Sequence, residues 1–297
     1  MRKRSILLLG LAVLVAAPVF AATDEAELAR IRRKVKKSGQ FYTVTYKNYV
    51  IKTDIDEQFA AEAAVYMNRF YDAFRSFFRP KPKVRTVPAV YFFKNREAYK
   101  TYVKKFSSDK LLNAGGFYRG RRGKSELFCW HNRPGTGFRG FPKRVVRHEG
   151  AHQLLNYILG THRIPIWYNE GVATFFEGWN VEKSREWNLT NLENTNTRFA
   201  VIRRTFGTKE FLDLHYLVKL NSKTWVPDDF GKKTFLHYAE VQSFMTFLLV
   251  SKNGRKFFTV IFKAVAQGKD PSKMLSRKVL DSAQRAWYKD IKERMKR

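Results

Sequence analysis

The stretch VVRHEGAHQLLNY, residues 145–157, places two histidines four positions apart with a glutamate between them. Positions four apart lie on one face of an α-helix, so the side chains of His148 and His152 can hold one ion from the same side. Glu149 lies one step around the helix, where it can reach a water on that ion without binding the ion itself. An ordinary amphipathic helix can carry the same pattern, so a further ligand has to decide between the two interpretations.

Glu170 is the predicted third ligand. A catalytic zinc site needs a third protein ligand and one open position for water. Glu170 occurs in RIPIWYNEGVATFFEG, residues 163–178, where most neighbours are apolar. A buried carboxylate is costly unless it is paired, protonated or bound to a cation, and a metal at His148 and His152 would satisfy it.

The pair of motifs HEGAH (148–152) and WYNEGVA (167–173) resembles the gluzincin metallopeptidases, whose third ligand is a glutamate on the next helix. More widely, residues 56–251 resemble the peptidase MA-like group of exported bacterial proteins, often described as domains of unknown function. The resemblance implies an α+β fold with a thermolysin-like zincin core. In that fold a small mixed sheet packs over the active-site helix and an all-helical part follows.

The resemblance also implies a chemistry. It makes the protein an exported zinc-dependent metallopeptidase with one Zn²⁺ per chain, held by His148, His152 and Glu170. The metal would polarise the scissile carbonyl and acidify its water, and Glu149 would be the general base. Related enzymes stabilise the oxyanion with a tyrosine or histidine from a later helix. Tyr238 is the candidate and His237 the reserve, although Tyr238 fits a core aromatic equally well.

Two residues that share a helix face with Glu170 are candidates for orienting a ligating histidine, because zinc-bound imidazoles are normally held by a hydrogen bond to their second nitrogen. These are Thr174 and Glu177. The position of Glu177 at a helix end slightly favours the alternative, an exposed acid. The other histidines, His131, His162 and His215, have no such neighbours and are interpreted as surface or loop residues.

The segment NAGGFYRG, residues 113–120, is the predicted substrate-binding edge. In gluzincins the sheet edge beside the zinc binds substrate as an added strand. The candidate residues here are Gly115, Gly116, Phe117 and Tyr118. The aminopeptidase branch carries a glutamate in the matching motif to hold a free amine. No acid occurs in this segment, which argues against aminopeptidase activity.

The beginning of the chain has the layout of a signal peptide. Basic residues at positions 2–4 precede an apolar run over 6–15 and small residues at 21 and 22. The apolar run is short for a membrane span, so residues 1–22 are predicted to be cleaved. No second apolar run of spanning length follows. The expected location is therefore the periplasm or the exterior, without a transmembrane segment after cleavage.

The remaining chain divides into two parts that form one catalytic unit. Residues 23–139 are expected to contain helices and a mixed sheet, and residues 140–297 are expected to be helical and to carry the zinc motifs. The expected helices are residues 24–37, 56–78, 95–106, 143–159, 166–177, 209–220, 235–251, 254–267 and 282–297. Strands are expected in two hairpins, around residues 41–54 and 115–130, and at 87–93.

The charge is strongly positive, with 57 basic and 26 acidic residues and a formal net charge of +31. Such a charge favours anionic polymers and lipids in general. The basic residues are spread along the chain without a recognised nucleic-acid motif, which argues against specific nucleic-acid binding. The predicted substrates are peptides or proteins, including peptide cross-links of the cell envelope. Two alternatives remain: a catalytically silent envelope protein with the same fold, and a polyanion-binding envelope protein.

We expect binding to polyanions to be mainly electrostatic. Retention of the protein on heparin or DNA should therefore weaken steeply as the salt concentration rises, because counterions screen and replace the contacts. Elution of matched DNA sequences across a salt gradient measures this. Affinity that survives high salt and depends on base sequence would contradict it.

Overall fold

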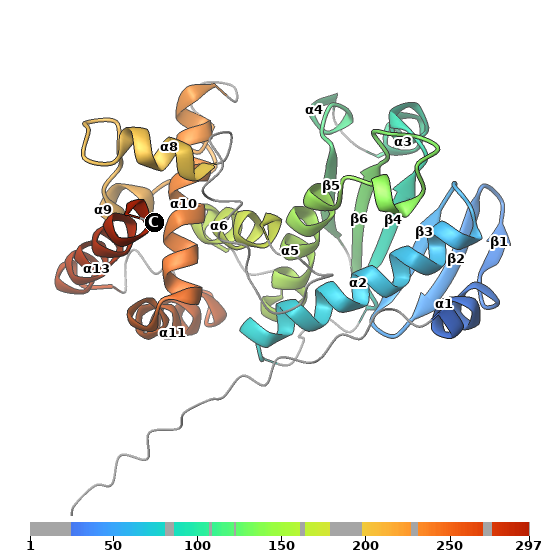
Figure 1. The fold of residues 1–297 in the computed structure, drawn as a ribbon, viewed down its shortest axis with the longest axis horizontal. Coiled ribbons are helices and arrows are strands. Elements are labelled where there is room, and N and C mark those ends of the chain that lie inside the picture. Colours follow the sequence, from blue (N-terminus) through green and yellow to red (C-terminus); the bar gives the residue numbers. More distant parts are fainter. Residues whose placement is uncertain are drawn as a thin grey trace, which may run out of the picture.

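The computed structural model describes residues 25–80, 86–106, 109–121, 123–160, 164–178, 198–226, 231–269 and 275–296. The predicted signal peptide, residues 1–22, lies outside these ranges. Within them, no helix has the length and apolar character that crossing a bilayer requires. Figure 1 shows α5 and α6 in the middle of the molecule, between the sheet and the C-terminal helices.

The sheet has six strands in the order β1-β2-β3-β4-β6-β5. Its strands are β1 (Lys36–Ser38), β2 (Phe41–Tyr46), β3 (Tyr49–Thr53), β4 (Ala89–Phe93), β5 (Gly116–Arg121) and β6 (Lys124–Trp130). The pairs β3/β4 and β4/β6 are parallel and the other pairs are antiparallel. Strand β5 is therefore an edge strand that runs antiparallel to its neighbour.

Alternating side chains of the central strands serve two different cores. On β4, Val90 and Phe92 belong to the main core, while Tyr91 and Phe93 belong to a smaller aromatic cluster on the other face. The period of two in a strand produces this division. Helices α2 (Glu57–Phe77) and α5 (Lys143–Leu159) contribute to the main core, and α3 (Arg96–Val103) contributes to the aromatic cluster.

The long helix α2 follows directly from its sequence. The Asp56 side chain caps its first turn by accepting a hydrogen bond from Phe59 N at 2.7 Å, as expected for an aspartate at this position. The helix runs across the sheet and α5 (Figure 1), and its apolar residues at helical spacing belong to the main core. Phe70 and Phe74, both fully buried, extend this face toward α6 (Ile166–Glu177) through ring contacts with Phe176.

The second half of the described chain is helical. The remaining helices are α1 (Glu25–Arg32), α4 (Asp109–Leu112), α8 (Arg198–Thr205), α9 (Leu214–Leu217), α10 (Lys232–Val250), α11 (Lys252–Ala266) and α13 (Arg277–Met295), with a 3₁₀ turn η1 (Phe138–Gly140). Helix α10 packs along α6, α8 and α11. One continuous core of buried residues runs from the sheet through α5 and α6 to Trp287 on α13.

The expected α+β class is confirmed, as are both hairpins and the helices over 143–159 and 166–177. Four local expectations were wrong. The first helix ends at Arg32, so Lys36–Ser38 is a strand. The last helix begins at Arg277 after its cap Ser276. Helix α8 was not expected, and the predicted helix over 209–220 is reduced to α9.

The shortening of the helix at 209–220 has a visible cause. The side chain of Asp213 accepts from Tyr216 N at 2.7 Å and begins a new helix at Leu214. Just before it, Leu212 N donates at 2.8 Å to the carboxylate of Glu240 on α10. This N–H is therefore bonded to a distant side chain, which periodicity within the segment cannot predict.

Glu240 is itself an unusual feature of the core. It is fully buried, and its Oε2 has no hydrogen-bond partner among the described residues. Burial raises the pKa of Glu240 to about 8, although the hydrogen bond from Leu212 N acts in the opposite direction. The folded protein thus retains a proton that an unfolded glutamate releases at lower pH.

We expect Glu240→Gln to stabilise the protein more at pH 8 than at pH 5. The folded-state pKa lies above the unfolded value, so the stability of the wild type falls as pH rises between these values, by up to about 1.4 kcal/mol per pH unit. Glutamine does not ionise and removes this loss. Denaturant unfolding of both proteins at the two pH values measures the difference. Glu97→Gln removes an equal charge from an exposed site and is the control. An equal effect of Glu240→Gln at both pH values would contradict the expectation.

Candidate metal centre

Helix α5, which carries the two histidines, packs closely against the sheet and α2. The buried Gln153 donates from Nε2 to the backbone carbonyls of Ala89 and Ser125, both at 3.1 Å. On the other side, a Cβ at Gly150 would lie 2.8 Å from the ring of Phe70. A side chain at this position would force the buried Phe70 ring to shift, so glycine within HEGAH permits the close packing of α5 against α2.

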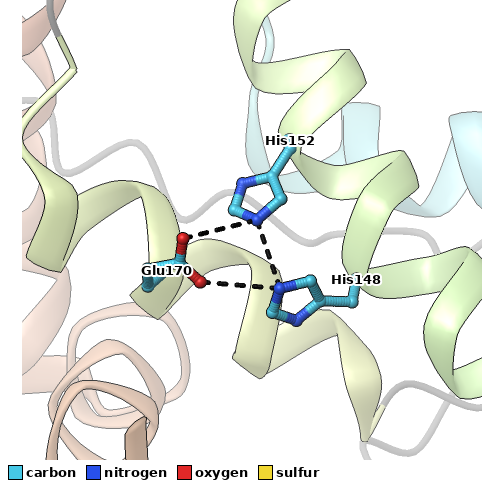
Figure 2. Close-up of side chains that lie close together, drawn as sticks. All are labelled: His148, His152 and Glu170. Carbon is cyan, nitrogen blue, oxygen red and sulfur yellow. Dashed lines mark hydrogen bonds and ion pairs between the residues drawn. The ribbon is translucent and has the colours of Figure 1, made fainter. Parts of the chain in front are cut away.

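The two histidines and Glu170 converge on one point (Figure 2). His148 and His152 project from the same face of α5, and Glu170 faces them from α6. The distance between the two Nε2 atoms is 3.2 Å. The Glu170 oxygens lie 3.5 Å from His148 Nε2 and 3.7 Å from His152 Nε2. These three are the candidate metal-binding group within the described part of the chain.

These separations are compatible with a tetrahedral zinc ion. With ligand bonds of about 2.0–2.2 Å, two ligand atoms of a tetrahedron are about 3.3–3.6 Å apart. The 3.2 Å between the two Nε2 atoms and the 3.5 Å from His148 Nε2 to Glu170 Oε2 are close to that range, while the 3.7 Å from His152 Nε2 is to the other oxygen of Glu170, Oε1. In addition, Glu170 Oε2 is buried and has no hydrogen bond among the described residues. A cation would satisfy an oxygen that is otherwise costly to bury.

Glu177, at the last position of α6, is the partner that orients His148. Its side chain is buried, and its Oε1 lies 2.7 Å from His148 Nδ1. This contact leaves Nε2 of His148 directed at Glu170 and His152. The expectation from the sequence that Glu177 is an exposed acid was therefore wrong. Helix α6 ends beneath α5 rather than at the surface, and that placement buries the carboxylate.

Two arginines complete the environment of Glu177. Arg144 Nε donates to Oε2 at 2.6 Å, and Arg198 contacts both oxygens through its terminal nitrogens. A third, Arg147, donates to the carbonyls of Phe176 and Glu177 at the end of α6. These contacts satisfy carbonyl groups that a helix end leaves without intrahelical partners.

Ionisation of the cluster follows from these contacts. Burial raises the pKa of the Glu177 carboxyl, but His148 and Arg198 lower it more, so its pKa lies below the usual range. For His148, burial opposes the charged form, yet the carboxylates of Glu170 and Glu177 raise its pKa to about 10. Burial also raises the pKa of Glu149, against the effect of the neighbouring histidines.

Glu149 is held by the edge strand. Its Oε2 accepts a hydrogen bond of 2.9 Å from the backbone N–H of Tyr118 on β5. The Tyr118 hydroxyl lies 2.9 Å from Oδ1 of Asn156, further along α5. Strand and helix are thus joined at two points, and the carboxylate stays beside the metal-binding group without belonging to it.

The direction of the Tyr118 N–H also shows which backbone groups of β5 point away from β6, toward the open edge of the sheet. In an antiparallel pair, alternate residues direct their N–H and C=O groups toward the neighbouring strand. Tyr118 points away from β6, so Gly116, two residues earlier, does so as well. A Cβ at Gly116 would lie 2.7 Å from the Phe128 carbonyl, so a side chain here would disturb the pairing.

A pocket of about 500 Å³ lies between the start of β5, α5 and α10. Among the predicted substrate-binding residues, Gly115 and Gly116 line it. The side chain of Phe117 belongs instead to the aromatic cluster on the far face of the sheet. The backbone groups of Phe117 point toward β6, so this arrangement does not favour a binding contribution from Phe117, and one from Tyr118 would come from its backbone; both remain predictions.

Tyr238 lines the same pocket from α10, with its ring centre 6.5 Å from that of His148. Burial raises the pKa of its phenol, so the hydroxyl retains its proton as a donor. The reserve candidate, His237, is not among the lining residues. It is buried, and its Nδ1 lies 2.9 Å from the carbonyl of Trp225.

One further expectation about a polar residue was wrong. The Thr174 hydroxyl donates to the carbonyls of Glu170 and Gly171 within its own helix instead of accepting from a histidine. His131 is a loop residue, directly after β6, and is buried there with Nε2 at 2.9 Å from the Gly137 carbonyl. His215 is paired with Asp281 at 2.6 Å, and His162 lies outside the described residues.

Sequence reasoning missed Arg144, Arg198 and Asn156 as members of the site. Asn156 lies on the same face of α5 as His148 and His152, because positions 148, 152 and 156 are four apart. That spacing could have indicated it. No spacing in the sequence distinguishes Arg144 and Arg198 from the other basic residues, because the chain has 57 of them.

Comparison with known families places one domain in this region. Residues 144–270 match the family described as Protein of unknown function (DUF1570). The matched range covers the metal-binding group, Glu149, Glu177 and Tyr238, and excludes the sheet. A comparison with curated proteins finds no match to the chain.

We expect the purified protein to bind about one Zn²⁺ per chain. Replacing His148, His152 or Glu170 by alanine removes a ligand and should abolish stoichiometric binding. Glu177→Gln should weaken it by about 10- to 100-fold, as is typical when the group that orients a ligand is lost. Metal content after dialysis and competition with a chelator measure both effects.

His215→Ala is the matched control, because this histidine pairs with Asp281 and lies outside the metal-binding group. It should retain the metal. Unchanged zinc content in Glu170→Ala would contradict the predicted ligand set.

Proposed function

We propose that the protein is a zinc-dependent metallopeptidase that hydrolyses peptide bonds. The observation that carries the proposal is the convergence of two imidazoles and a carboxylate at separations of 3.2–3.7 Å, with Glu149 beside them. The resemblance of HEGAH and WYNEGVA to the gluzincins supports the same chemistry. The protein would act after export, on peptides, proteins or peptide cross-links of the envelope.

The site would hold the metal through His148, His152 and Glu170. Zinc in such a site supplies Lewis acidity, which polarises a carbonyl group and makes water more acidic. The described part of the chain offers three protein ligands, so a zinc ion held by them would have a fourth position for a non-protein ligand. A purely structural zinc site is normally closed by a fourth protein ligand, and this difference favours catalysis.

Glu149 would be the general base. Its carboxylate lies at the pocket wall, where it can accept a proton from water and deliver it to the leaving nitrogen. The Tyr118 N–H orients this carboxylate. Tyr238 faces the pocket with a protonated hydroxyl, which can donate a hydrogen bond to the developing oxyanion.

The substrate would lie along the start of β5. The outward groups of Gly116 can pair with an extended peptide, as in other cases of strand addition. Glycine at this position also lets the edge lie close against α5, because a Cβ there would be 3.0 Å from the Val145 side chain. The N–H of Tyr118 is already bonded to Glu149, so the substrate contacts on this edge would centre on Gly116.

We expect Glu149→Gln to retain zinc and to lower kcat by about 10²- to 10⁴-fold, because the base is lost and no ligand is removed. Tyr238→Phe should lower kcat by about 10²-fold or more, with a smaller effect on KM, if its hydroxyl stabilises the oxyanion. Turnover of quenched peptide libraries at fixed zinc content measures both.

The peptides should be acetylated at the amino terminus, because no acid in residues 113–120 is available to hold a free amine. Tyr216→Phe, at an exposed position, is the control for loss of a hydroxyl. If the zinc-loaded wild type cleaves no peptide, or if Glu149→Gln is as active as the wild type, the proposal fails. The catalytically silent alternative would then remain.

A further inference from the structure

The pocket wall opposite the β5 edge is built around two guanidinium groups. Arg144 projects from the first turn of α5, and Arg198 projects from the start of α8. Their common acidic partner is Glu177, which also accepts from His148. One carboxylate therefore meets two permanent positive charges and one imidazole donor, so this wall has a surplus of positive charge.

The two arginines differ in how many of their nitrogens contact Glu177 and in how exposed their side chains are. Both terminal nitrogens of Arg198 contact Glu177, and the side chain is only 12% exposed. Arg144 uses its Nε alone for Glu177, and its side chain is 63% exposed. Neither terminal nitrogen of Arg144 has a hydrogen-bond partner within the described residues. The contact at Nε holds the guanidinium plane, and its outer edge has no partner in the described part of the chain.

A guanidinium edge with two available nitrogens matches a carboxylate, which it can bind through two parallel hydrogen bonds. The other carboxylate that lines the pocket, Glu149, is bonded to the Tyr118 N–H. Within the described part of the chain, no acid other than Glu149 and Glu177 lines the pocket, so none is free to attract a cationic group. The available polar contact on the α5 and α8 side is therefore specific for an anion.

We propose that Arg144, supported by Glu177 and Arg198, is a specificity residue that binds a carboxylate of the substrate next to the bond that is cleaved. This inference rests on the proposed peptidase function and adds its substrate class, acidic peptides. The carboxylate can belong to an aspartate or glutamate side chain or to the carboxyl terminus. Both present the same planar group to the same two nitrogens.

The first measurement is binding, in the Glu149→Gln background with zinc content verified, so that peptides are not consumed. The probes are acetylated alanine hexapeptides: a neutral one with an amidated carboxyl terminus, one with a free carboxyl terminus, and three amidated ones with a single glutamate at position 3, 4 or 5. At least one acidic peptide should bind about tenfold or more tightly than the neutral one, as expected for hydrogen bonds to a charged group.

Arg144→Gln should remove most of this preference, and Arg144→Lys should restore it only in part, because lysine retains the charge but lacks the fork. The control is Arg204→Gln, which removes an equal charge from an exposed position on α8 that does not line the pocket. It corrects for the general attraction of anions to a strongly basic chain, and should leave the preference unchanged.

The pattern among the acidic peptides distinguishes the sources of the carboxylate. Preference for the free carboxyl terminus indicates removal of terminal residues, and preference for one glutamate position indicates recognition of a side chain. Equal binding of all peptides, no binding of any, or a preference that survives Arg144→Gln overturns the inference. Turnover by the protein with Glu149 intact tests the peptidase function separately. An acidic preference without turnover would support the anion site and reject the hydrolase.

Discussion

The Glu177 carboxylate is the interaction on which the arrangement of the site depends. It lies at the end of α6 and is bonded to His148 and Arg144 from α5 and to Arg198 from α8. A buried carboxylate needs such partners, because removing a charge from water costs several kcal/mol. Three helices are therefore held in one relative position, and the imidazole that they orient faces Glu170 and His152.

The sheet contributes the other half of the site. Gln153 anchors α5 to the backbones of β4 and β6, and Tyr118 of the edge strand bonds to Glu149. The metal-binding group thus lies where the mixed sheet meets the helical part, with main-chain groups of β5 on one side and the arginines on the other. This division places the β5 edge and a charged wall on opposite sides of one pocket, an arrangement compatible with the proposed peptidase.

Features that depend on local spacing could be predicted from the sequence. The approach of His148 and His152 follows from helical periodicity alone, and Glu170 could be predicted as their partner because an acid in so apolar a segment needs a cation or a proton. The α+β class and the bounds of α5 and α6 follow from similar patterns. Where the prediction failed, as at Leu212, a backbone group is bonded to a side chain far away in the sequence.

By itself, the sequence determined the spacing of the two histidines, the position of the glutamate between them and the outline of a mixed sheet followed by helices, but not β1 or α8. Only the tertiary structure decided that Glu177 is buried, that Thr174 bonds within its own helix, and that Arg144 and Arg198 face the pocket. The physical reason is that a helix position specifies the direction of a side chain but not what it meets. The neighbour is set by the packing of α5, α6, α8 and α10 around one core.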